Sequence, residues 1–118
     1  MAGGVAANYD DRDGTIWLDG KLVPWREASV HVLTHALHYA SSVFEGLRCY
    51  NGQPFALQAH SERLIRSAEI MGFRIPWSLA EIMQACRDTL ADSGLRDAYM
   101  RPFAWRGSEQ MGVAAQNA

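Results

Sequence analysis

Residues 43–50, with the sequence VFEGLRCY, bring together residue types that could form a binding surface. Side chains of a strand alternate between its two faces. One face would carry Phe44, Gly46, Arg48 and Tyr50; the other would carry Val43, Glu45, Leu47 and Cys49. Glycine within a strand often marks close approach of a ligand, and arginine can pair with an anion. The alternative is an ordinary half-exposed strand with a solvated arginine and a glycine required by packing.

A second alternating segment, residues 97–105, surrounds another arginine with aromatic rings. Tyr99, Arg101, Phe103 and Trp105 would share one face of this strand. A guanidinium in such a place either stacks on the rings or binds a carboxylate or phosphate. Both interpretations of Arg101 stay open on these residues alone. Pro102 predicts a sheet edge or a bulge.

Arg63 occupies an electrostatically unusual place in a predicted helix over residues 60–71. With Ser61 as the N-cap, Arg63 would lie in the first turn, where the helix dipole favours anions. An anion such as phosphate bound at this end would explain the cation. The alternative is an exposed arginine that extends into water.

Three histidines within eight residues raise the question of a metal site. His35 and His38 are one helical turn apart, and His31 lies four residues earlier. No carboxylate or cysteine is placed to complete a ligand set, so we expect no metal. A helix cap or a hydrogen-bonded core position suits these histidines better.

The predicted elements run from hairpins to helices and back to a strand. Asp19-Gly20 predicts a hairpin between residues 15–18 and 22–25, and Asn51-Gly52 a second hairpin with a return strand over 53–58. A short helix is expected over 35–42. Ser78 and Glu81 form a capping box for a third helix, which Gly94 would end. This order predicts an α+β two-layer domain, with a largely antiparallel sheet and two main helices on one face.

Composition limits the classes of protein that fit. The 118 residues suffice for one domain, with 48% hydrophobic residues and a net charge of −2. That charge argues against a nucleic-acid partner, and we expect neither a membrane span nor a secretory signal. Cys49 and Cys86 have no metal or disulfide spacing, which favours reduced thiols in a cytoplasmic protein. We expect residues 1–14 to be loose and 114–118 to be an unstructured tail.

Two motifs carry a resemblance to a known family. Residues 35–50, HALHYASSVFEGLRCY, and residues 98–102, AYMRP, followed by Gly107 and residues 111–113, MGV, resemble the branched-chain-amino-acid aminotransferases. These are fold-type-IV enzymes that use pyridoxal 5′-phosphate (PLP). The likeness spans about 16–113 and covers only the family's smaller N-terminal domain. The family's Schiff-base lysine is therefore expected beyond residue 118, and the 118-residue chain alone is expected to be inactive.

The resemblance implies roles for individual residues. Arg63 would bind the PLP phosphate, Arg101 the substrate carboxylate, and Tyr99 would help line the site. Phe44 and Gly46 would form the pocket floor, with Gly46 letting a backbone N–H approach the carboxylate, and Arg48 would support it. Tyr39 and Val113 would reach across a dimer interface into the neighbouring site, and the histidine-rich stretch would support Tyr39.

The resemblance also implies a reaction, amino transfer between a hydrophobic L-amino acid (leucine, isoleucine or valine) and 2-oxoglutarate, in a homo-oligomer. Two alternatives stay open. One is another fold-type-IV enzyme, a D-amino-acid aminotransferase or aminodeoxychorismate lyase, although Ala40-Ser41-Ser42 departs from the Gly-Asp-Gly expected there. The other is a stand-alone binding module without catalysis.

Overall fold

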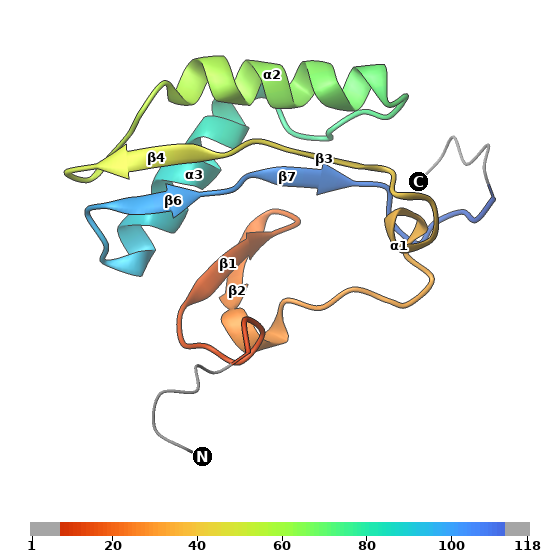
Figure 1. Ribbon diagram of the computed structural model, residues 1–118, viewed down its shortest axis with the longest axis horizontal. Helices are drawn as coiled ribbons and strands as arrows, with labels where there is room; N and C mark the ends of the chain where they lie inside the picture. The colour runs from red at the N-terminus through yellow and green to blue at the C-terminus, as the bar shows by residue number, and fades with distance from the viewer. Residues whose placement is uncertain (1–7, 113–118) are drawn as a thin grey trace.

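The computed structural model describes residues 8–112. Within this range the chain forms short strands, two long helices, one short helix and a 3-10 turn (Figure 1). In chain order they are β1 (Thr15–Leu18), β2 (Lys21–Pro24), η1 (Trp25–Glu27), α1 (His35–Tyr39), β3 (Ser42–Phe44), β4 (Leu47–Tyr50), β5 (Gln53–Pro54), α2 (Leu57–Ile70), α3 (Leu79–Ser93), β6 (Ala98–Met100) and β7 (Phe103–Trp105).

The central strands form two long antiparallel segments that are interrupted at the same level. β4 pairs with β5 and β6, and β3 pairs with β7, all antiparallel. The predicted strands over 43–50 and 97–105 therefore exist, but each is broken in the middle. Pro102 has no N–H to donate to the ladder, and its carbonyl instead accepts the N–H of Glu45 at 2.9 Å. The break thus falls at Glu45 on one segment and beside Pro102 on the other.

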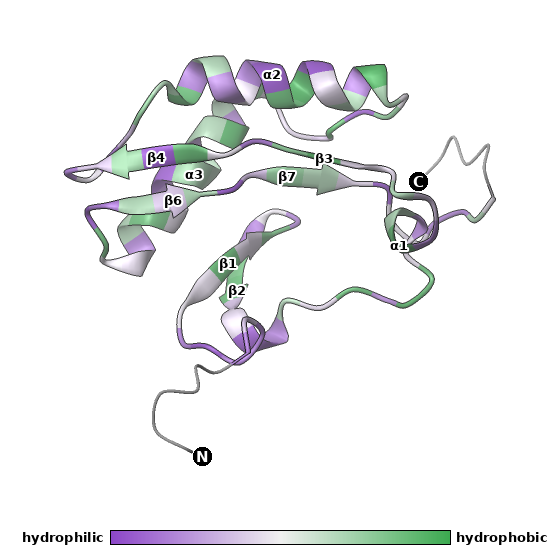
Figure 2. Cartoon of the chain, viewed as in Figure 1, coloured by the Kyte–Doolittle hydropathy of each residue, from purple (hydrophilic) through white to green (hydrophobic). Residues whose placement is uncertain are grey.

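The core lies between these strands and the two long helices. Leu47 and Cys49 of β4 pack with Leu57 of α2 and with Cys86 and Leu90 of α3. Both cysteines are free thiols buried in this core. Figure 2 shows that α2 mixes hydrophobic and hydrophilic residues, as a helix with one buried side does. The predicted α+β architecture, with antiparallel strands and two main helices, is confirmed.

The start of α2 differs from the prediction. The helix begins at Leu57, after Ala56 in the left-handed conformation (φ 53°), so the return strand ends at Pro54 rather than residue 58. Ser61 is not the N-cap but a fully buried residue inside the helix. Burial of Leu57 in the core extends the helix by a turn beyond the predicted start. Arg63 consequently lies in the second turn, and the helix-dipole argument for it was wrong.

The third helix and the first hairpin follow the prediction closely. Ser78 and Glu81 form the capping box of α3, and Gly94 ends the helix with φ 71°. β1 and β2 pair around the Asp19-Gly20 turn. Trp17 of this hairpin packs edge-on against Trp77, with ring centroids 5.3 Å apart.

Ion pairs attach the first described residues to the 3-10 helix η1. Residues 9–14 form turns and bends, and Arg26 pairs with Asp11 and Asp13 at 2.8 Å each. The rest of the expected loose segment and the expected tail at 114–118 lie outside the described residues. No helix among the described residues has the length and apolarity that a membrane crossing requires.

Candidate functional site

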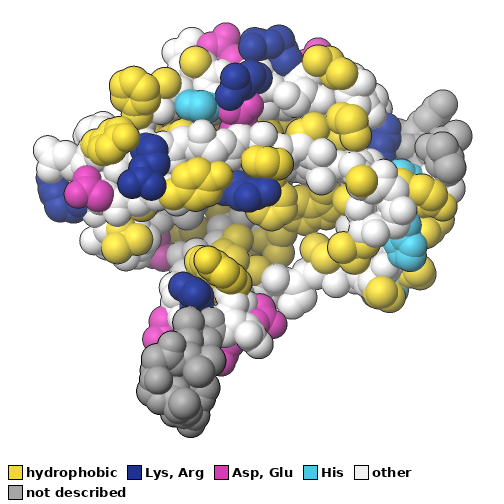
Figure 3. All heavy atoms as spheres, in the orientation of Figure 1, with side chains coloured by type: hydrophobic (Ala, Val, Ile, Leu, Met, Phe, Trp, Pro, Cys, Tyr) yellow, Lys and Arg dark blue, Asp and Glu magenta, His cyan; other side chains and the backbone are white. Residues whose placement is uncertain are grey.

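One of the two faces predicted for the strands over 43–50 and 97–105 is exposed. Phe44 and Tyr99 are 56% and 53% exposed, and Gly46, Arg48 and Arg101 are exposed with them. Figure 3 shows hydrophobic and basic side chains side by side along these strands. Arg48 lies opposite Tyr99 in the register, and Phe44 opposite Phe103. The structure therefore brings together five of the predicted site residues on one open face: Phe44, Gly46, Arg48, Tyr99 and Arg101.

The ring of Tyr99 covers Gly46 and leaves no room for a side chain at this position. A Cβ atom added at Gly46 would lie 2.5 Å from the Tyr99 hydroxyl and 3.0 Å from two of its ring carbons. Real Cβ atoms do not approach other heavy atoms so closely, so Tyr99 would have to move. The absence of a side chain at Gly46 thus lets the Tyr99 ring lie directly on the β3–β4 connection.

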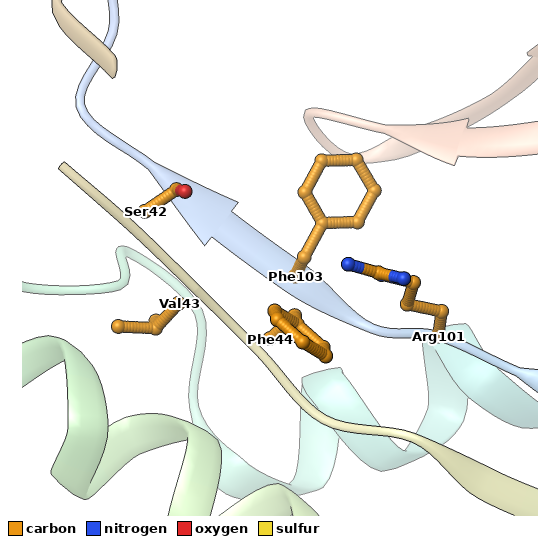
Figure 4. A pocket seen from close by; sticks show the side chains of 5 residues that line it. All are labelled: Ser42, Val43, Phe44, Arg101 and Phe103. Carbon is orange, nitrogen blue, oxygen red and sulfur yellow. The ribbon is translucent and has the colours of Figure 1, made fainter. Parts of the chain in front are cut away.

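Arg101 stacks on Phe44 of the neighbouring strand. Its guanidinium carbon lies 3.8 Å from the ring centroid of Phe44. Figure 4 shows the two groups together with Phe103 in a shallow pocket, which also has Ser42 and Val43 in its wall and a volume of about 150 Å³. A stacked guanidinium still has its N–H donors in its own plane, where they can reach a carboxylate. Stacking and anion binding are therefore compatible for Arg101.

Arg63 lies on the helix side of the strands and pairs with Glu45. Its Nε and Nη2 donate to the two carboxylate oxygens at 2.7 and 2.8 Å, and Nδ1 of His60 lies 2.7 Å from Oε1. Glu45 is only 5% exposed, whereas the side chain of Arg63 is 60% exposed. The hydrogen bonds from Arg63 lower the pKa of Glu45 to about 2, so this carboxylate is ionised at neutral pH.

Sequence reasoning missed Glu45 and His60 as members of this cluster. The signal was present, because Glu45 falls on the strand face that also carries Leu47 and Cys49. A carboxylate in such a row must find a cationic or hydrogen-bonding partner when the row is buried. His60 and Arg63 are three residues apart on α2, so they project from one side of that helix.

The histidines near α1 have partners other than a metal. Nε2 of His35 donates to the carbonyl of Gly112 at 2.6 Å, and Nδ1 bonds the Ser41 hydroxyl at 2.6 Å. His38 bonds the carbonyl of Val32 at 2.8 Å. Among residues 8–112, no group of three or more His, Cys, Asp or Glu side chains is arranged to hold a metal ion.

Of the two predicted interface residues, the structure describes Tyr39, which lies away from the open face. Tyr39 is on α1, at the end of the β3–β7 pair, with its ring centroid 4.4 Å from that of His35 (Figure 1). This contact fits the expected support of Tyr39 by the histidine-rich stretch. Val113 lies outside the described residues. Lys21, the one lysine of the sequence, is exposed on β2 of the first hairpin.

Comparison with known proteins identifies the family. The family model for amino-transferase class IV matches residues 42–118, which is most of the chain. The chain belongs to the class IV aminotransferases. It is 51% identical over 109 residues to a branched-chain-amino-acid aminotransferase of Pseudomonas aeruginosa, and 48% identical over 109 residues to a probable one of Rickettsia bellii. These matches cover 89% and 92% of the chain but only 36% and 38% of the relatives.

Solved class IV aminotransferase structures share this fold. A branched-chain amino acid aminotransferase from Escherichia coli superposes with a TM-score of 0.81 and 44% identity, covering 86% of this chain and 35% of that one. The enzyme of Thermoproteus uzoniensis, solved with norvaline, gives 0.83 and 37%, covering 90% and 37%. The chain therefore spans little more than a third of the proteins it resembles.

Proposed function

We propose that this chain is the N-terminal domain of a PLP-dependent branched-chain-amino-acid aminotransferase. The full-length protein would move an amino group between leucine, isoleucine or valine and 2-oxoglutarate. The names of the relatives at 48–51% identity support the substrate class. A further branched-chain amino acid aminotransferase, which shares 40% identity with this chain, was solved with pyridoxamine 5′-phosphate and supports the cofactor.

The residues present fit the phosphate end of PLP. Arg63 is a permanent cation whose side chain is 60% exposed although it is held by a buried carboxylate. It would bind the phosphate through the N–H groups that Glu45 does not use. When bound, PLP supplies an electron sink for the amino transfer, and the protein supplies orientation and electrostatics. A lysine from the remainder of the protein would bind the cofactor, because Lys21 belongs to the first hairpin.

The open face of β3–β4 and β6–β7 fits the substrate. Arg101 would pair with the carboxylate that amino acid and 2-oxo acid share, while Phe44 fixes the plane of its guanidinium. Tyr99, lying on Gly46, would form the adjoining wall, and Arg48 would support it. The single observation that carries the proposal is Arg101 stacked on Phe44 at 3.8 Å in a shallow pocket of this exposed face.

Self-association and a cytoplasmic location extend the proposal. Tyr39 and Val113 would enter the site of a neighbouring subunit in a homo-oligomer. Large apolar side chains near α1, Val32 and Leu37, are 70% and 64% exposed and would be covered in such an assembly. Two cysteines buried as free thiols suit a reducing compartment.

The test is Arg101→Met in a full-length protein that carries this sequence. Loss of a charge-assisted pair costs about 1.5–3 kcal/mol, so kcat/KM should fall about 10- to 100-fold for both leucine and 2-oxoglutarate. Arg87→Met, on the exposed side of α3, is the matched control and should leave both values unchanged. Unchanged kinetics in Arg101→Met would limit Arg101 to stacking. A wild-type protein that transfers no amino group from branched-chain amino acids would overturn the proposed function.

A further inference from the structure

The structure buries a carboxylate beside the proposed phosphate anchor. Among the buried residues that the structure describes, Glu45 is the only acid. It lies in the break between β3 and β4, where its own N–H bonds the Pro102 carbonyl at 2.9 Å. Its backbone is thus fixed by the neighbouring strand, and its side chain points to α2. Burying a charge costs free energy, so a buried carboxylate held in one place points to a role beyond packing.

The pair uses only part of the Arg63 guanidinium. Nε–H and one N–H of Nη2 form the side edge that faces Glu45. The other edge, made by Nη1 and the second N–H of Nη2, keeps the geometry that binds a carboxylate or phosphate in a bidentate manner. Because the side chain is 60% exposed, that edge is accessible to a second anion.

His60 fixes the carboxylate from a second direction. Oε1 of Glu45 accepts from both Arg63 Nη2 and His60 Nδ1, while Oε2 accepts from Arg63 Nε. An ionised carboxylate can only accept, so Nδ1 of His60 must carry the proton. With both oxygens engaged, neither the carboxylate nor the guanidinium can rotate without breaking a hydrogen bond.

We propose that Glu45 and His60 are positioning residues that orient Arg63 so that its outer guanidinium edge receives the phosphate of PLP. The inference rests on the proposed function. A free arginine side chain would lose up to about 2 kcal/mol of rotamer entropy on binding, and the Glu45–His60 pair removes that loss in advance. Because Glu45 stands between Phe44 and Gly46, one strand break positions the phosphate anchor and the substrate face together.

The test separates the phosphate contribution from all other binding. Dissociation constants for PLP and for pyridoxal, which lacks the phosphate, are measured on the cofactor-free full-length protein. The variants are Glu45→Gln, Arg63→Met and the double variant. Glu69→Gln and Arg66→Met, at exposed positions of the same helix, are the matched controls.

Arg63→Met should weaken PLP binding about 10- to 100-fold and leave pyridoxal binding unchanged. Glu45→Gln should weaken PLP binding about three- to tenfold, again without an effect on pyridoxal, and should add nothing to Arg63→Met. The sign is decisive, because removing a negative charge near the phosphate would by itself strengthen PLP binding. The controls should match wild type in both constants.

The other possible outcomes distinguish a failure of the positioning role of Glu45 and His60 from a failure of the proposed phosphate anchor. If Arg63→Met weakens PLP binding and Glu45→Gln does not, or Glu45→Gln affects PLP and pyridoxal equally, the positioning role is overturned and the proposed function stands. If Arg63→Met changes neither constant, the phosphate anchor of the proposed function fails. Should Glu45→Gln not fold, His60→Phe takes its place, with an expected two- to fivefold loss for PLP alone, on the order of one hydrogen bond. An unchanged ratio of the two constants there overturns the inference.

Discussion

The two sides of the β3–β4 segment differ residue by residue. Glu45, Leu47 and Cys49 face the helices and are at most 5% exposed, whereas Phe44 and Tyr50, on the other side, are more than half exposed. The buried side holds the core together, and the exposed side carries the groups proposed for substrate binding. Neighbouring residues in the sequence therefore serve different ends: substitutions on one side should change stability, and those on the other should change binding.

The two arginines of the proposed site follow the same division. Arg63 reaches the segment from the helix side and is held by ion pairing with a buried acid. Arg101 lies on the open side and is held by stacking on Phe44. The buried carboxylate of Glu45 fixes one edge of the Arg63 guanidinium through directional hydrogen bonds. The ring of Phe44 limits only the plane of the Arg101 guanidinium. We therefore expect Arg63 to be the more tightly oriented of the two.

The largest difference should appear between Leu47→Ala and Arg48→Ala. Leu47 is 2% exposed in the core, so truncation should lower the free energy of unfolding by about 2–5 kcal/mol through lost burial and a cavity. Arg48 is exposed, so its truncation should change that free energy by less than about 0.5 kcal/mol. Denaturant unfolding of the cofactor-free full-length protein checks both. Comparable losses in the two variants would contradict the division between the sides.

The alternation that defines this comparison could be predicted, because the period of a strand is fixed by backbone geometry. The capping box at Ser78 and Glu81 was also predictable, since its signal is local. The start of α2 was not: Ser61 has the right type for a cap, but burial of Leu57 and Ser61 in the tertiary structure decided the outcome. The Glu45–Arg63 pair was missed because its partners are 18 residues apart.

Low pH should reduce the stabilising contribution of Glu45, which is the one charged residue among Glu45, Leu47 and Cys49 on the buried side. The pKa of Glu45 is lowered from 4.5 to about 2, chiefly by Arg63. A lowered folded-state pKa means that the pair stabilises the protein above about pH 4.5 and that this contribution is lost as the pH falls toward 2. The contribution is on the order of 1–3 kcal/mol, discounted because Arg63 is largely exposed.

The measurement compares wild type with Glu45→Gln at pH 7, 4 and 3. The difference in unfolding free energy should be largest at pH 7 and shrink at each step. Glu69→Gln serves as the control and should show no such narrowing. A difference that stays constant down to pH 3 would mean that Glu45 acts by shape rather than by charge.

A small effect on stability, together with an effect on binding, is expected for Gly46→Ala on the exposed side of the segment. The new Cβ atom would point to the open face, 2.5 Å from the Tyr99 hydroxyl. Since Tyr99 is 53% exposed, its ring can swing into solvent, and the loss of unfolding free energy should stay below about 1 kcal/mol. The displaced ring should nevertheless raise KM for the amino acid several-fold, because the proposed wall beside Arg101 has moved.

Tyr99→Ala removes the same wall without adding a methyl group and should raise KM to a similar extent. In the double variant the two effects should not add, because the Cβ atom then has no ring to displace. Additive losses would show that the methyl group of Gly46→Ala obstructs the substrate itself, which would place the substrate carboxylate closer to this backbone than to Tyr99.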